Sequence, residues 1–85
     1  MSNTITMYST GACPYCAQAE NFLTRKGASI TKIRVDQSEV AREKMISLTG
    51  KRTVPQLFIG DTYVGGFDNL LALEQQGKLN ALLAD

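Results

Sequence analysis

The feature that most constrains this fold is a cysteine pair at the junction between a predicted strand and a predicted helix. Both cysteines of the 85-residue chain lie in the segment Cys13-Pro14-Tyr15-Cys16. The preceding residues Thr4–Tyr8 alternate and are β-prone, which predicts a strand. Pro14 favours the first position of a helix, because the N–H that proline lacks would be unpaired there in any case. The two thiols are therefore expected together at the start of the first helix.

The first helix and a second strand follow directly. The helix is predicted to begin at Pro14 and to end in a basic turn before Gly27. Cys16, Ala19, Phe22 and Leu23 lie on its inward face. Ile30–Val35 alternates again and predicts the second strand. A strand–helix–strand unit pairs its two strands in parallel through a right-handed crossover.

A second helix and a hairpin complete the predicted sheet. Asp36 and Glu39 resemble a capping box, and the helix behind them continues to Gly50 with inward residues Ala41, Met45 and Leu48. Gly60-Asp61 separates Gln56–Ile59 from Thr62–Val64 as a two-residue hairpin, and the leucines from 70 to 83 predict a closing helix and a final turn. The order β-α-β-α-β-β-α predicts an α/β fold with a four-stranded mixed sheet flanked by helices.

Composition excludes several classes of protein and of site. Two cysteines are too few for the disulfide framework of a small secreted scaffold or for a structural zinc site in one chain. The absence of histidine excludes Cys-His and Ser-His catalytic pairs and histidine-bound metals. Nine basic and eight acidic residues argue against nucleic-acid binding. We therefore expect one domain over residues 1–85, monomeric, with neither nucleic-acid nor membrane partners.

The N-terminal segment gives an indication of the cellular compartment of the protein. Met1–Thr6 has neither the basic region nor the apolar region of a signal peptide. No apolar run approaches the ~20 residues that span a bilayer. These features predict a cytoplasmic chain, in which an exposed thiol pair is normally kept reduced.

The positions of the two cysteines suggest different roles in a thiol reaction. Cys13 is the predicted N-cap, so its sulfur lies near free backbone N–H groups and the positive end of the helix dipole, which stabilise a thiolate. Cys16 lies one turn further in, within reach of a disulfide. We therefore expect Cys13 to attack and Cys16 to resolve, as in thioredoxin-like redox motifs. A structural disulfide, half of an intermolecular metal site and an inert pair are the alternatives.

Three motifs together resemble the dithiol glutaredoxins of the bacterial glutaredoxin 3 type. They are Cys13–Cys16, Thr53-Val54-Pro55-Gln56 and Gly65–Leu70, and their order and spacing match over essentially the whole chain. The resemblance implies the thioredoxin fold and a glutathione-dependent oxidoreductase that reduces protein disulfides and glutathione mixed disulfides. It also implies glutathione as co-substrate, no metal, and ribonucleotide reductase as a family-typical partner.

The resemblance further implies a glutathione site. Pro55 is expected to be cis and to face the cysteines, while the backbone of Val54 pairs with the cysteine moiety of glutathione. The N–H groups of Phe67 and Asp68 would hold the γ-glutamyl carboxylate, and the Asp68 carboxylate its ammonium group. The complete set of implied glutathione residues is Tyr15, Arg42, Thr53, Val54, Pro55, Gly66, Phe67 and Asp68.

Some of these assignments have plainer alternatives. Arg42, in the second predicted helix, would bind the glycine carboxylate of glutathione or simply be a solvated arginine. Asp68 could be no more than a first-turn acid that the helix dipole favours. Lys51 and Arg52 add positive charge near the same end. The chain also departs from many relatives in having Thr10 where they carry lysine, and Phe67 where they carry a further cysteine.

Two other functions remain open on the sequence. One is a redoxin of similar fold that thioredoxin reductase reduces without glutathione, and Gly65–Asp68 argues against it. The other is an iron–sulfur carrier, a dimer that bridges a cluster through Cys13 and bound glutathione. Pro14 argues against the carrier, because cluster-binding relatives generally replace that proline.

Overall fold

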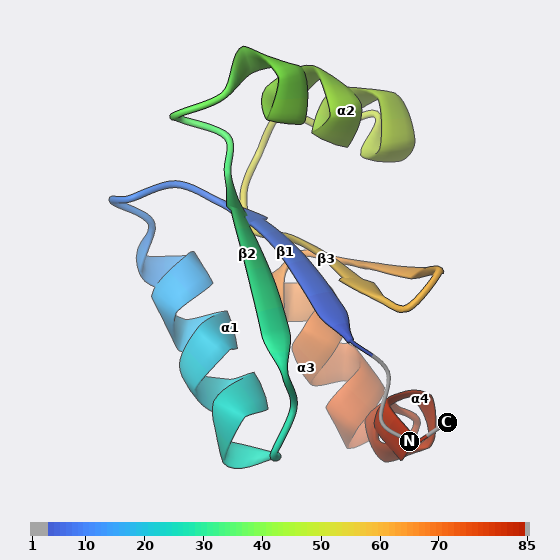
Figure 1. Cartoon of the computed structure of the whole chain (residues 1–85). Coiled ribbons are helices and arrows are strands. Elements are labelled where there is room, and N and C mark those ends of the chain that lie inside the picture. The colour runs from blue at the N-terminus through green and yellow to red at the C-terminus, as the bar shows by residue number, and fades with distance from the viewer. Residues whose placement is uncertain (1–3, 85) are drawn as a thin grey trace.

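The computed structural model describes residues 4–84, whose strands form one mixed sheet in the order β2-β1-β3-β4 (Figure 1). The central strand β1 (Ile5–Ser9) pairs in parallel with β2 (Ile30–Arg34) and antiparallel with β3 (Gln56–Ile59). β4 (Thr62–Gly65) then pairs antiparallel with β3 through the predicted hairpin. The mixed four-stranded sheet is confirmed.

Helices cover both faces of this sheet. The four helices are α1 (Pro14–Arg25), α2 (Glu39–Thr49), α3 (Phe67–Gln75) and α4 (Leu79–Ala84). α1 and α3 lie together on one face of the sheet. α2 packs against the other face through Met45, and in Figure 1 it lies beyond the upper ends of β1 and β2. A short helix, α4, stands where the sequence predicted only a final turn. Among residues 4–84, no helix combines the length and apolar character needed to cross a membrane.

The alternation of β1 explains why the core has two parts. Ile5 and Met7 point to the α1 and α3 face, and both are fully buried. Tyr8 points to the other face and packs with Val35 and Met45, the buried residue of α2. The larger part contains Cys16, so that cysteine belongs to the core as well as to the first helix.

The start and the inward face of α2 differ from the sequence prediction. Ser38, and not Asp36, is the N-cap, and its hydroxyl accepts the N–H of Ala41 at 3.2 Å. The Asp36 carboxylate instead binds the Arg34 side chain and the N–H of Gly11, which lies 25 residues earlier in the chain. Leu48 is 53% exposed, and Ile46 packs against the core in its stead. The helix ends as predicted at Gly50, whose φ of 72° favours glycine.

Candidate active site

Cys13 caps the first helix, as the sequence predicted. Its backbone is extended, and its Sγ accepts the N–H of Cys16 at 3.2 Å, while Pro14 occupies the first turn. Cys13 is half-buried and Cys16 is only 4% exposed, and both are free thiols. The sulfur that the helix N-terminus stabilises is therefore also the one that a disulfide substrate can approach.

Burial distinguishes the second cysteine from the first. Loss of solvent raises the pKa of the Cys16 thiol from 9.0 to about 12, and the interaction with Cys13 acts in the same direction. A backbone hydrogen bond from Thr10 opposes the rise. At neutral pH Cys16 is therefore a protonated thiol beneath Cys13, suited to a second step and not to the first attack.

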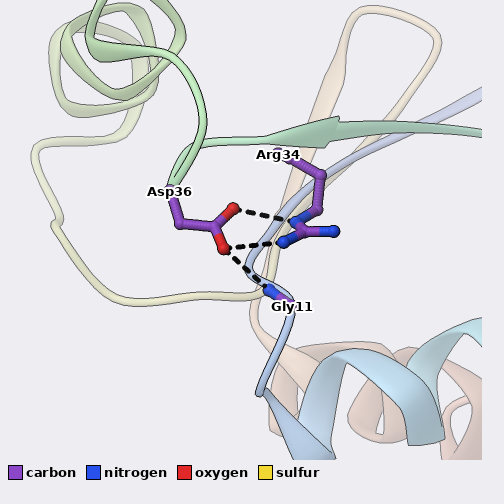
Figure 2. A network of polar contacts seen from close by, with 3 residues as sticks. All are labelled: Gly11, Arg34 and Asp36. Atoms are coloured by element: carbon purple, nitrogen blue, oxygen red, sulfur yellow. Dashed lines mark hydrogen bonds and ion pairs between the residues drawn. The ribbon is translucent and has the colours of Figure 1, made fainter.

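The loop before Cys13 is tied to the end of β2 by a charged network (Figure 2). The Arg34 guanidinium donates two hydrogen bonds of 2.8 Å to the Asp36 carboxylate, which also accepts the Gly11 N–H at 3.1 Å. The Arg34 bonds and the Gly11 N–H hold the pKa of Asp36 well below its usual range. A Cβ at Gly11 would collide with the Arg34 guanidinium in its present position, so a larger residue there would displace the end of that side chain.

A hollow of about 180 Å³ lies on this side of the cysteines. Its lining includes Cys13 and Cys16 with Thr10, Gly11, Glu20, Lys32 and Arg34. Both cations have acidic partners, since Lys32 contacts Glu20 at 3.2 Å and Arg34 contacts Asp36. The charges on this side are therefore largely neutralised within the protein.

The other side of Cys13 faces the loop that precedes β3. The Cys13 thiol donates to the Val54 carbonyl oxygen at 3.7 Å, across 41 residues of sequence. The Val54–Pro55 peptide bond is cis, as the family resemblance implied. Cys13 thus lies at the border between this loop and the hollow that contains Cys16.

A groove of about 260 Å³ extends from this loop to the start of α3. Tyr15 and Phe67 flank it, with their ring centroids 6.4 Å apart. The groove combines backbone edges, two aromatic rings, a lysine and the first turn of a helix, a suitable set for an extended peptide with anionic ends. It is lined by Tyr15, Lys51, Thr53, Val54, Pro55, Gln56, Gly66, Phe67, Asp68 and Asn69.

Seven of the eight residues assigned to glutathione from the resemblance line this groove, and Arg42 is the exception. Arg42 borders a separate hollow beside Asp36 and Ser38, at the start of α2. Lys51, which the sequence suggested only as nearby positive charge, lines the groove itself. The contact between Arg42 and glutathione stays a prediction.

Sequence reasoning assigned no role at this site to Gln56 and Asn69. The Asn69 side chain accepts the Gly66 N–H at 3.1 Å and so holds the start of α3, which asparagine at the third helical position could have signalled. Gln56 belongs to the second family motif and begins a predicted strand, but neither feature assigns a role to its side chain. Nothing in its local pattern indicates that its side chain is buried beside the groove.

Comparison with known proteins agrees with this geometry. The glutaredoxin family model matches residues 5–64. A glutaredoxin of Neisseria meningitidis serogroup B is 51% identical over 81 residues, which cover 94% of this chain and 95% of the relative. Glutaredoxin 3 of Escherichia coli K12 is 40% identical over 79 residues, 93% of this chain and 95% of the relative. A crystal structure of a buckwheat glutaredoxin–glutathione complex superimposes with a TM-score of 0.88 at 30% identity, covering 96% of this chain and 77% of that chain.

Proposed function

This chain belongs to the glutaredoxin family, and from that premise we propose that Cys13 is its nucleophile and that the adjoining groove binds glutathione. The activity of the chain is glutathione-dependent thiol–disulfide exchange on the thioredoxin fold. The observation that carries the assignment is the place of Cys13 Sγ, between the Cys16 N–H at 3.2 Å and the Val54 carbonyl at 3.7 Å. One sulfur there touches both the helix N-terminus and the groove loop.

In the proposed reaction on a glutathione mixed disulfide, the Cys13 thiolate attacks the glutathione sulfur. A bond forms between Cys13 and glutathione, the substrate S–S bond breaks, and the substrate sulfur leaves as a thiolate. A second glutathione thiolate then attacks the bound glutathione sulfur, which releases oxidised glutathione and restores the Cys13 thiolate. No external base is needed, because thiolates both attack and leave.

With a protein disulfide, the Cys13 thiolate attacks one substrate sulfur, the substrate S–S bond breaks, and the other substrate sulfur leaves as a thiolate. Cys16 then attacks Cys13 Sγ in the resulting mixed disulfide. The second substrate thiol leaves, the Cys13–Cys16 disulfide forms, and two glutathione molecules reduce it. Burial is the main cause of the raised Cys16 pKa, but Cys13 adds to it. Bonding of Cys13 into the mixed disulfide removes that second cause. Cys16 therefore loses its proton more easily at the stage when it must attack.

The lining of the groove supports a specific placement of glutathione. The Val54 N–H and carbonyl would pair with the cysteine moiety, beside Thr53 and Pro55. The first N–H groups of α3, from Phe67 and Asp68 after Gly66, would hold the γ-glutamyl carboxylate. The Asp68 carboxylate would hold the ammonium group, and Tyr15 would cover the tripeptide. The buckwheat relative, solved with glutathione, supports this use of the fold.

The glycine carboxylate of glutathione has two candidate cations. The family resemblance favours Arg42, whereas Lys51 lines the groove. We propose that Lys51 makes the larger contribution, so Lys51→Ala should raise KM for a glutathionylated peptide about threefold, an effect in the range of partly exposed charge pairs. Arg42→Ala is the matched comparison. A larger KM increase in Arg42→Ala than in Lys51→Ala would assign the carboxylate to Arg42.

The assay that tests the function uses a small peptide disulfide-bonded to glutathione, with product formation coupled to glutathione reductase. We expect saturable turnover, and faster reaction than with the same peptide capped by cysteamine. Equal rate constants for the two caps would contradict a glutathione groove. Direct reduction of the Cys13–Cys16 disulfide by thioredoxin reductase, without glutathione, would favour the rival redoxin.

We propose the oligomeric state, cellular location and substrates of the protein on the same basis. Residues 1–85 would act as one monomeric domain in the cytoplasm, where the thiol pair is kept reduced. Glutathionylated proteins and protein disulfides would be the substrates, with ribonucleotide reductase a family-typical example. Neither a metal cofactor nor a nucleic-acid or membrane partner is part of the proposal.

A further inference from the structure

The Gln56 side chain is buried to 2% exposure at the edge of the groove, where a polar group must be hydrogen-bonded to be tolerated. Its Nε2 donates to the Thr53 carbonyl oxygen at 2.9 Å and to Thr53 Oγ1 at 3.2 Å. Its Oε1 accepts the Tyr63 hydroxyl at 2.6 Å. Because the Thr53 carbonyl can only accept, the amide nitrogen must face it, and this determines the orientation of the whole side chain.

The hydrogen bond from Gln56 to the Thr53 carbonyl also affects the Val54 N–H. The Thr53 carbonyl and the Val54 N–H belong to the same peptide group, which is trans and planar, so the two bonds point in opposite directions. A donor that fixes the carbonyl therefore fixes the direction of the Val54 N–H as well. It also polarises the peptide group, which strengthens that N–H as a donor.

Tyr63 holds Gln56 from the neighbouring strand. Its ring contacts the Phe58 ring with centroids 5.1 Å apart, and this contact restricts where its hydroxyl can lie. The hydrogen-bonded chain thus runs from Tyr63 on β4, through Gln56 at the start of β3, to the Thr53–Val54 peptide.

We propose that Gln56, oriented by Tyr63, is a positioning residue that aims the Val54 N–H at a peptide carbonyl of the bound thiol. The inference rests on the proposed glutathione groove and adds a selectivity to it. A thiol whose cysteine is embedded in a peptide, as in glutathione, offers the carbonyl that this N–H requires. A thiol without it, such as cysteamine, gains nothing from the chain of hydrogen bonds.

The test compares one peptide capped through a disulfide by glutathione or by cysteamine, using the full chain. The peptide carries its sulfur on a C-terminal cysteamide, so its own thiol has no following carbonyl and only the glutathione cap supplies one. Gln56→Met keeps the length and burial of the side chain and removes its three hydrogen bonds to Thr53 and Tyr63. We expect KM for the glutathione-capped peptide to rise about fivefold, the factor for one neutral hydrogen bond, with kcat nearly unchanged. The rate constant for the cysteamine-capped peptide should not change.

Tyr63→Phe tests the same chain without altering a buried residue. It keeps the ring contact with Phe58, removes the hydroxyl, and should raise KM for the glutathione-capped peptide by about twofold. This variant decides the question if Gln56→Met fails to fold. Thr62→Val, which removes an exposed hydroxyl from the same strand outside the chain of hydrogen bonds, is the control and should behave as wild type.

The outcomes distinguish the proposed role of Gln56 from the proposed glutathione groove. An unchanged KM in Tyr63→Phe and in folded Gln56→Met would overturn the role of Gln56 and leave the groove intact. An equal loss with both caps would also overturn it, since the effect would then be structural. A wild-type protein that does not distinguish the two caps would instead overturn the glutathione groove itself.

Discussion

The two loops that meet at Cys13 are held in place by contacts of different kinds. The loop before Cys13 depends on the partly exposed ion pair of Arg34 and Asp36, through the Gly11 N–H. The loop on the groove side is held by the buried amide of Gln56. Exposed ion pairs are screened by water and salt and contribute little, whereas a buried polar group is costly to leave unpaired. The groove loop should therefore be much more sensitive to substitution.

The same contrast separates the two thiols. Cys13 is half-buried and contacts both loops, whereas Cys16 lies in the core on the side of Arg34 and Asp36. In the proposed mechanism, reaction with a glutathione mixed disulfide uses the groove side alone, whereas reduction of a protein disulfide also needs the buried thiol.

The largest effect is expected from the cysteines themselves. Cys13→Ser should lower turnover of a glutathione mixed disulfide by at least about a thousandfold, because a hydroxyl cannot replace the thiolate. Cys16→Ser should keep much of that activity and lose reduction of protein disulfides, which requires a resolving thiol. The two substrates are assayed in parallel with glutathione. Loss of the mixed-disulfide reaction in Cys16→Ser alone would reverse the assignment of nucleophile and resolver.

On the groove side, Asp68→Asn should raise KM for a glutathionylated peptide about tenfold with a smaller change in kcat. The variant keeps the shape of the side chain and removes the charge proposed to hold the γ-glutamyl ammonium, a bond stronger than a neutral one. Asp61→Asn in the β3–β4 hairpin is the control for loss of one surface charge. If both variants gave the same KM, Asp68 would be only a first-turn acid of α3.

The buried thiol predicts a specific loss of stability at alkaline pH. The pKa of Cys16 is about 12 in the folded protein and 9.0 ordinarily. Between these values the unfolded chain releases the proton first, so the stabilisation present below pH 9 is lost as the pH rises toward 12. The free energy of unfolding of the reduced protein should therefore fall more steeply above pH 9 than that of Cys16→Ala. Parallel curves for the two proteins would show that the thiol does not titrate differently on folding.

The smallest effect is expected at the charged network beside Gly11. Because the pKa of Asp36 is lowered on folding, its contribution is present above about pH 4 and is lost as the pH falls below that value. Asp36→Asn should therefore melt slightly lower than wild type at neutral pH, and the difference should vanish in acid.

The activity of Asp36→Asn shows how strongly the Arg34–Asp36 pair holds the loop before Cys13, compared with the hold of Gln56 on the groove loop. Turnover of Asp36→Asn should change by about twofold at most, in keeping with a partly exposed pair. Glu20→Gln breaks the Lys32 pair without touching the Gly11 loop, and serves as the control. A loss of activity in Asp36→Asn as large as that in Gln56→Met would show that both loops are held equally firmly.

Local signals explain which parts of the fold and site could be predicted. Proline after Cys13 and the Gly60-Asp61 pair act within a few residues, so the helix cap and the hairpin were correctly predicted. The capping box at Asp36 was wrong, because an arginine on β2 and a glycine 25 residues away compete for the same carboxylate. Leu48 was wrong for a similar reason, since the packing of α2 on the sheet selects Ile46.

The sequence alone determined which thiol caps the first helix, because a helix cap depends on neighbouring residues and on the lack of an N–H in proline. Motif order also indicated the family and most of the groove lining. Only the tertiary structure decided which cation lines the groove and how the Val54 peptide is oriented. Lys51, Gln56 and Tyr63 acquire these places through the pairing of strands and the packing of loops. Such contacts depend on the whole fold and have no local pattern in the sequence.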